Sequence, residues 1–219
     1  MTLDLDVRSG GRATFSVAAP DMRRLLPGAA GLVYAGIQLD GGITAAAYRS
    51  ISTVPDNRLS APFSGSFATA TTLTWGLSQV MFVLTLVAFA RSGAVGTSRL
   101  GRAGAWLAVV GGVVFVIAHA VSLVFRDART DDPPGVTAVT LFAGASVLTA
   151  IGFLLAGTAV VRAGRWTSWR RYTVLAVGAW MVCLVPLQMT SLLAVSVAVY
   201  AALIAAFAVA LLAEPTGRP

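Results

Sequence analysis

The feature that most constrains this chain is a series of long apolar stretches that contain almost no charged residues. A helix that crosses the hydrocarbon layer of a membrane needs about 20 consecutive residues that are mostly apolar. The chain has six such segments, at about residues 25–43, 71–90, 103–125, 136–161, 171–189 and 192–213. Charged residues make up only 11% of the chain, whereas soluble domains contain about a quarter. The sequence therefore predicts an all-α integral membrane bundle of six transmembrane helices and argues against a water-soluble globule.

The limits of these segments define the expected domain organisation. Residues 23–213 form the predicted transmembrane domain, between a cytoplasmic N-terminal tail, residues 1–22, and a cytoplasmic C-terminal tail, residues 214–219. The N-terminal tail has no apolar region followed by a small-residue cleavage site, so no cleavable signal peptide is expected. A single helix across the last two segments would be about 65 Å long, much longer than a membrane is thick. We therefore expect a tight turn at residues 188–191.

The arginines predict how the helices are oriented. All 16 basic residues are arginine, and with the N-terminus in the cytoplasm twelve of them fall in cytoplasmic segments. The remaining four, Arg49, Arg58, Arg126 and Arg129, fall outside. Because positive charge is enriched on the cytoplasmic side of membrane proteins, the sequence predicts that both termini are cytoplasmic. The net charge of +7 is thus assigned to membrane orientation and not to a nucleic-acid partner.

Two further patterns are typical of a helical membrane bundle. Trp166 and Trp169 lie at the predicted cytoplasmic boundary, where tryptophan is enriched in membrane proteins. Small residues recur at helical spacing in the third and fourth segments, among them Gly104, Ala108 and Gly152. Such residues let neighbouring helices approach closely, so we expect them to serve helix packing within the chain. A homodimer through the same kind of face is the alternative.

Scarce or missing residue types exclude several chemistries. The chain has no lysine, which removes the Schiff-base lysine of pyridoxal enzymes and the phosphate-binding lysine of P-loops. It has one histidine, His119, and one cysteine, Cys183, whereas a zinc site needs three or four ligands. We therefore predict neither a metal site nor a bound cofactor. Cys183 lies in an apolar run and is expected to pack as a small buried hydrophobe.

Polar residues within the predicted spans are the candidates for a functional site, because they are costly in a membrane. Judged by depth, the outer half of the bundle holds a ligand-binding set: Gln38, Asp40, Gln79, His119, Ser122 and Gln188. We predict that this set lines a polar, water-accessible cavity that opens outward. The alternative for each residue is a structural hydrogen bond to a neighbouring helix, or a position near the water boundary. An Asp40–His119 pair would orient the imidazole, but the sequence does not show whether the two residues meet.

The longest connection, about residues 44–70, is expected to cover this cavity. Its prolines and aromatic residues favour a packed lid, although loops of this length are also found disordered. The stretch Val54-Pro-Asp-Asn-Arg-Leu-Ser-Ala-Pro-Phe-Ser, followed by Phe67 and an apolar span, resembles the first outer loop of small uncharacterised multipass membrane proteins of actinobacteria. That resemblance implies a bacterial plasma membrane and no particular activity.

These observations leave two classes of function. The first is a non-enzymatic membrane protein that binds or passes a small or lipid-like molecule through the outward-facing pocket, or serves as a subunit of a membrane complex. The second is an intramembrane enzyme of the hydrolase type centred on His119, with Ser146 as the only plausible nucleophile. Six spans resemble the core size of rhomboid proteases, but Val147 stands where their Gly-x-Ser-Gly motif requires glycine. The sequence favours the first class, with the lipid bilayer and either a homodimer or a membrane-complex subunit as partners.

Overall fold

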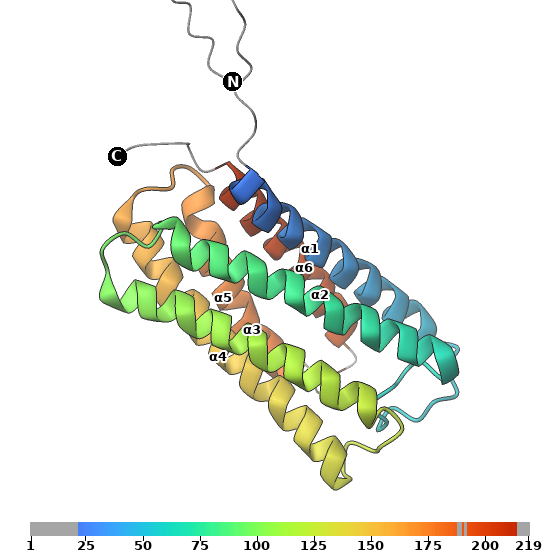
Figure 1. The fold of residues 1–219 in the computed structure, drawn as a ribbon. Coiled ribbons are helices and arrows are strands. Elements are labelled where there is room, and N and C mark those ends of the chain that lie inside the picture. The colour runs from blue at the N-terminus through green and yellow to red at the C-terminus, as the bar shows by residue number, and fades with distance from the viewer. Residues whose placement is uncertain (1–21, 188–189, 191, 214–219) are drawn as a thin grey trace, which may run out of the picture.

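The computed structural model describes residues 22–187, 190 and 192–213. This part of the chain folds into six α-helices that lie side by side (Figure 1). The helices are α1 (Met22–Arg49), α2 (Gly65–Ser92), α3 (Arg99–Val124), α4 (Pro133–Ala163), α5 (Arg170–Leu187) and α6 (Leu193–Leu212). Among the described residues, the only pairing of extended backbone is one bridge between Arg58 and Arg129. The predicted all-α class is therefore confirmed.

Each predicted apolar segment corresponds to one helix, and the limits differ most at α1 and α2. Helix α1 continues to Arg49 and α2 begins at Gly65, so the connection between them is shorter than the expected residues 44–70. Threonines near these ends lower the local hydropathy without breaking a helix. The hydroxyl groups of Thr69 and Thr71 donate to helix carbonyls four residues earlier, those of Gly65 and Phe67. Their polar groups are thus satisfied inside the helix.

The helices α5 and α6 are separate, as the length argument predicts. Helix α5 ends at Leu187 and α6 begins at Leu193. The side chain of Thr190 stabilises the break, because its hydroxyl donates to the Leu187 carbonyl at 2.9 Å and accepts from the Leu192 amide at 3.2 Å. The other residues of the expected turn, 188, 189 and 191, lie outside the described residues.

Five of the helices, α2 to α6, are long and apolar enough to cross a membrane. Helix α1 has sufficient length at 28 residues, but it is not among these five. Gln38 and Asp40 lower the hydropathy of its second half. The architecture is consistent with a helical membrane bundle.

The six helices form a closed ring. Each helix packs against the next one in the sequence, and α6 packs against α1. Consecutive helices run in opposite directions, so the start of α1 and the end of α6 lie at the same end of the bundle (Figure 1). We call this end, where α1, α3 and α5 begin, the arginine end. The opposite end, where α2, α4 and α6 begin, is the cap end.

Aromatic side chains fill the inside of the ring in the half next to the arginine end. Phe207 of α6 lies 5.2 Å from Phe89 of α2 and 5.6 Å from Phe153 of α4, measured between ring centroids. Trp166, from the α4–α5 connection, packs 6.5 Å from Phe207. All four side chains are buried, so this half of the ring has a solid centre.

Helices α3 and α4 pack in backbone contact through glycines. A Cβ atom placed on Gly152 would lie 2.5 Å from the backbone nitrogen of Ala108, and one on Gly104 would lie 2.9 Å from the carbonyl oxygen of Gly152. These distances leave no space for a side chain. The prediction that these small residues serve helix packing within the chain is therefore confirmed, and the structure shows that α3 and α4 are the helices that meet there.

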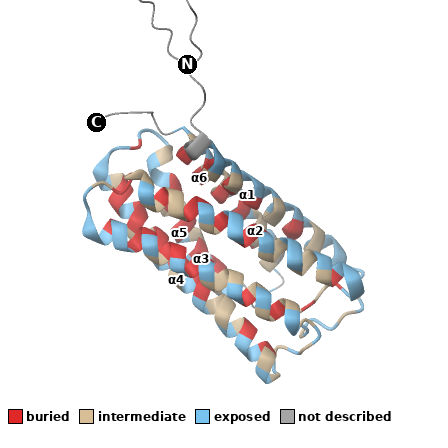
Figure 2. Ribbon diagram, viewed as in Figure 1, coloured by how far each residue is buried: buried red, intermediate tan, exposed pale blue. Residues whose placement is uncertain are grey.

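The exposed surface of the bundle is largely apolar, and buried residues lie on the helix faces that meet neighbouring helices (Figure 2). At the predicted cytoplasmic boundary, Trp166 is only 1% exposed and packs against Phe89 and Phe207, whereas Trp169 is 51% exposed. The prediction that Cys183 is buried is wrong. Cys183 is exposed, because it lies on the side of α5 that faces away from the ring.

Candidate functional site

A cavity of about 900 Å³ occupies the inside of the ring in the half next to the cap end. All six helices contribute to its lining, for example Tyr34, Gln79, His119, Ser146, Met181 and Tyr200. The aromatic cluster around Phe207 fills the remaining half of the ring. The cavity is therefore closed on the side that faces the arginine end, and its volume is within the usual range for small-molecule sites.

Four of the predicted site residues line this one cavity: Gln38, Gln79, His119 and Ser122. They come from α1, α2 and α3. The prediction that polar residues of several helices share a cavity is thus met for this part of the set. Whether they bind a ligand stays a prediction.

Asp40 does not belong to this group. It is exposed and is not among the residues that line the cavity. Successive residues of an α-helix are rotated by about 100°, so Asp40 lies about 200° around α1 from Gln38 and the two cannot face the same chamber. In the described part of the chain no ion pair or hydrogen bond joins Asp40 to His119. Gln188, the last predicted member, lies outside the described residues.

The floor of the cavity is a short hydrogen-bonded chain of three buried side chains. The amide nitrogen of Gln79 donates to the Tyr34 hydroxyl at 3.4 Å, and the Tyr34 hydroxyl donates to that of Tyr200 at 3.4 Å. Phe82 supports the chain from below, because its ring stacks on Tyr34 with centroids 4.7 Å apart. These residues come from α1, α2 and α6, which are neighbours in the ring.

The chain is incomplete at Gln79. Its side-chain oxygen Oε1 is buried and has no hydrogen-bond partner among the described residues. A buried acceptor without a partner costs about 1–3 kcal/mol of stability. The floor of the cavity therefore contains an acceptor without a hydrogen-bond partner, halfway along α2.

Gln38 and Trp75 form the wall above this floor. The Gln38 amide donates to the Ser78 hydroxyl at 3.1 Å, and Ser78 donates to the carbonyl of Trp75 at 2.8 Å. The indole of Trp75 lies against Gly41, where a Cβ atom would come within 2.3 Å of Nε1. The polar atoms of Gln38 thus have a structural role in joining α1 to α2, besides facing the cavity.

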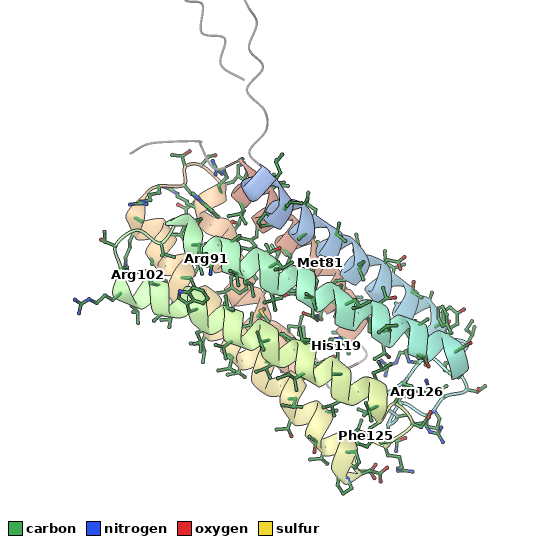
Figure 3. All side chains as sticks on the ribbon, viewed as in Figure 1. Met81, Arg91, Arg102, His119, Phe125 and Arg126 are labelled. Atoms are coloured by element: carbon green, nitrogen blue, oxygen red, sulfur yellow. The ribbon has the colours of Figure 1, made fainter. Side chains whose placement is uncertain are left out.

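His119 lies on α3, closer to the end of the bundle that carries Arg126 than to the end that carries Arg91 and Arg102 (Figure 3). Its Nδ1 atom is 2.9 Å from the carbonyl oxygen of Phe115, and a carbonyl only accepts, so Nδ1 carries a proton in this arrangement. The imidazole packs edge-on against Phe142 at 4.9 Å. Nε2 is the ring nitrogen that takes no part in this hydrogen bond.

Ser146 lines the same cavity as His119. Its hydroxyl donates to the carbonyl of Phe142, one turn earlier on α4, at 2.8 Å. The hydrogen bonds of both residues to their own helices are the usual way to satisfy such groups inside an apolar bundle.

Two connections close the cap end, and we call them together the cap: residues 50–64 and residues 125–132. Their backbones pair, because the Leu59 amide donates to the Ala128 carbonyl at 3.1 Å and the Thr130 amide donates to the Asn57 carbonyl at 2.7 Å. Within the first connection, Phe63 is buried. The expected covering segment is thus a packed structure tied to a second connection.

Charged groups are found at the mouth of the cavity and not on its floor. Arg49 and Asp56 form an ion pair at 3.2 Å, and Arg58 lines the cavity beside them. On the outer side of the cap, Arg129 and Asp131 are 3.0 Å apart, and this hydrogen bond lowers the pKa of Asp131 below its ordinary value. The deeper part of the chamber is lined by uncharged groups.

Sequence reasoning missed Tyr34 and Tyr200, which complete the floor. Both lie inside long apolar segments, and a tyrosine hydroxyl there needs a partner in the same way as a glutamine does. That signal was available in the sequence, but nothing in it places the two tyrosines beside Gln79.

Among the described residues, no three histidine, cysteine or carboxylate side chains lie close enough together to hold a metal ion. The chain was also compared with protein-family models, curated proteins and solved structures. None of the three comparisons found a match.

Proposed function

We propose that this chain is a membrane protein with six transmembrane helices that binds a small, uncharged molecule in the cavity at the cap end. The observation that carries the proposal is the cavity itself, which is built from all six helices and contains Gln38, Gln79, His119 and Ser122 in its lining. Polar side chains inside a membrane bundle are costly. A ligand site at the centre of the ring explains why these polar residues line the same cavity.

The count of six spans rests on the place of α1 in the ring. Helix α1 packs between α2 and α6, and both of these are long and apolar enough to cross a membrane. A helix of 28 residues that lies alongside two spans has to cross with them. Its lower hydropathy is explained in part by Gln38, which faces the cavity and not the lipid.

The proposed orientation places the arginine end in the cytoplasm and the cap outside. The described connections and helix ends at the arginine end carry nine arginines and no acidic residue: Arg23, Arg24, Arg91, Arg99, Arg102, Arg162, Arg165, Arg170 and Arg171. At the cap end four arginines, residues 49, 58, 126 and 129, are balanced by four aspartates, residues 56, 127, 131 and 132. This asymmetry favours a cytoplasmic arginine end. The resemblance of the first cap connection to actinobacterial proteins supports the bacterial plasma membrane.

Binding is favoured over passage by the filled half of the ring. Phe89, Phe153, Phe207 and Trp166 close the way from the cavity to the arginine end. A molecule that enters at the cap reaches the floor and stops there. We therefore propose a binding protein and not a channel.

The orientation is tested by labelling single cysteines, because the chain has only Cys183 to remove. In a Cys183→Ser background, Thr53→Cys places a thiol in the cap, and Thr97→Cys places one at the arginine end; both positions are exposed. We expect a membrane-impermeant maleimide to label the first in intact cells and the second only after permeabilisation. The reverse pattern would overturn the orientation.

Ligand binding is tested by filling the cavity. Ser122→Trp puts a large side chain into the chamber, whereas Ile117→Trp is its control on the exposed side of the same helix. We expect mass spectrometry of the purified protein to find a small molecule bound to the wild type and to the control, and not to the cavity-filled variant. Equal amounts in all three would contradict the proposal.

A further inference from the structure

The hydrogen-bonded chain at the floor of the cavity leaves a donor and an acceptor unused at its two ends, whichever way the Gln79 amide is oriented. The Gln79 side chain and the hydroxyls of Tyr34 and Tyr200 form a linear chain in which each group gives one hydrogen to the next. With the amide nitrogen toward Tyr34, the Gln79 oxygen is the unused acceptor and the Tyr200 hydroxyl keeps an unused hydrogen. Turning the amide over reverses the direction of the chain. Both N–H groups of Gln79 are then unused donors, and the Tyr200 hydroxyl oxygen has an unused acceptor position.

In both orientations of the Gln79 amide, one group that both donates and accepts a hydrogen bond can satisfy the two ends of the chain. One end lacks a donor and the other lacks an acceptor, and only the Tyr34 hydroxyl separates them. The smallest uncharged group that gives one hydrogen bond and accepts another is a hydroxyl. A ketone or an ether only accepts, so it leaves one end unmet.

The surroundings of the floor exclude a charged group there. Gln79 and Tyr200 are 4% and 6% exposed, and the charged residues that line the cavity lie at its mouth. A carboxylate or an ammonium group would lose its hydration at the floor without an opposite charge to compensate it. The walls above, from Phe115, Phe142, Met181 and Leu184, provide apolar contacts for the rest of the molecule.

We propose that the ligand is a neutral apolar alcohol that enters with its hydroxyl group first and places it between Gln79 and Tyr200. This inference rests on the proposed ligand-binding function, and it adds the chemical class of the ligand and its direction in the cavity. The apolar body lies against the aromatic and aliphatic walls, and the far end points toward the cap.

The experiment uses two photoreactive probes, a long-chain alcohol that carries a diazirine and its methyl ether, on the purified full chain. The ether has the same apolar body but has lost the donor. We expect the wild type to cross-link the alcohol about tenfold better than the ether, the ratio that corresponds to one buried hydrogen bond. Peptide mapping should place the cross-links of both probes on residues that line the cavity.

The variants separate the floor from the rest of the chamber. Gln79→Leu removes the amide from the floor, and Thr85→Val removes a buried hydroxyl of the same helix that does not line the cavity. We expect the preference for the alcohol to fall to about one in the first and to persist in the second. Tyr34→Phe keeps the aromatic ring and removes the hydroxyl that joins Gln79 to Tyr200. It should also reduce the preference for the alcohol over the ether. This second variant guards against a loss of preference that is due only to misfolding of Gln79→Leu.

Failure of this inference is distinct from failure of the proposed function. If Ser122→Trp abolishes cross-linking of both probes but the wild type does not distinguish them, the cavity binds ligands and the assignment to alcohols is wrong. If Ser122→Trp leaves the cross-linking of both probes unchanged, the cavity is not the binding site and the proposed function is wrong as well. A preference for the alcohol that persists in both Gln79→Leu and Tyr34→Phe would also overturn the inference.

Discussion

At the scale of single residues, the position of a side chain around its helix decides what it does. Gln38 and Asp40 look equivalent in the sequence, since both are polar and both interrupt the same apolar segment. Gln38 faces the cavity and bonds to Ser78, whereas Asp40 is exposed on the other side of α1. Depth along a helix can be estimated from the sequence, but rotation about its axis depends on which neighbours it meets.

The unmet hydrogen bond of Gln79 leads to a stability prediction at this scale. We expect Gln79→Leu to raise the free energy of unfolding of the ligand-free protein by about 1 kcal/mol, because leucine removes a buried acceptor that lacks a partner. Tyr34 keeps its hydrogen bond to Tyr200 in this variant. Thermal unfolding in detergent, followed by the loss of helical signal, measures the change.

The control for this prediction is Gln38→Leu. Its amide is bonded to Ser78, so the same substitution should lower the unfolding free energy by about 1 kcal/mol. A decrease of equal size for both variants would show that the Gln79 oxygen has a partner in solution.

At the scale of secondary-structure elements, the contact between α3 and α4 depends on residues without side chains. The backbones approach so closely at Gly152 that a Cβ atom would lie 2.5 Å from the Ala108 nitrogen. Main-chain atoms cannot move aside as a flexible side chain can. The spacing of small residues in the sequence predicts close helix packing, although it does not say which helices or which glycines meet.

We expect Gly152→Ala to destabilise the protein by about 1–3 kcal/mol, because the added methyl group forces the two helices apart. Gly144→Ala is the control on the same helix, since nothing lies within 4 Å of a Cβ atom at that position. It should leave stability unchanged or raise it by up to about 1 kcal/mol through the better helix propensity of alanine. Melting temperatures of the two variants in the same detergent check the difference, and equal effects would contradict the proposed backbone contact.

The ends of α1 and α2 are also an element-scale result. Their extension by several residues beyond the apolar segments shortens the first cap connection to residues 50–64. Hydropathy marks where a helix can lie in lipid, but hydrogen bonds such as that of Thr71 to the Phe67 carbonyl allow the helix to continue beyond that limit. The type and approximate position of each element were predictable from hydropathy, while its last turns were not.

At the scale of the whole molecule, closure of the ring creates the cavity. Helices α1 and α6, the first and last in the sequence, pack against each other, and Tyr34 and Tyr200 meet there at 3.4 Å. Neither residue is close to the other in the sequence. The floor exists only because the ring closes.

The cap is likewise formed by two connections that are distant in the sequence. Arg58 and Arg129 form an antiparallel bridge in which the hydrogen bonds are made by the residues on either side. Such pairs have Cα atoms about 4.5 Å apart, which is suitable for a disulfide. We expect Arg58→Cys with Arg129→Cys, in the Cys183→Ser background, to form a disulfide under mild oxidation, detected as a reducible change in gel mobility.

The matched control replaces Arg129→Cys by Asp131→Cys, which lies two residues beyond the bridge. This second pair should remain reduced under the same conditions. Cross-linking of both pairs at equal rates would mean that the two connections are not held in the observed register.

The sequence by itself indicated one helix for each apolar segment and the uneven distribution of arginine, because these properties are sums over neighbouring residues. It also indicated Gln38, Gln79, His119 and Ser122 as polar residues at a shared depth. Only the tertiary structure decided that Asp40 faces outward, that Trp166 is buried, and that Gln79 meets Tyr34 and Tyr200. The physical reason is that packing around the ring fixes the rotation of each helix, and no single segment contains that information.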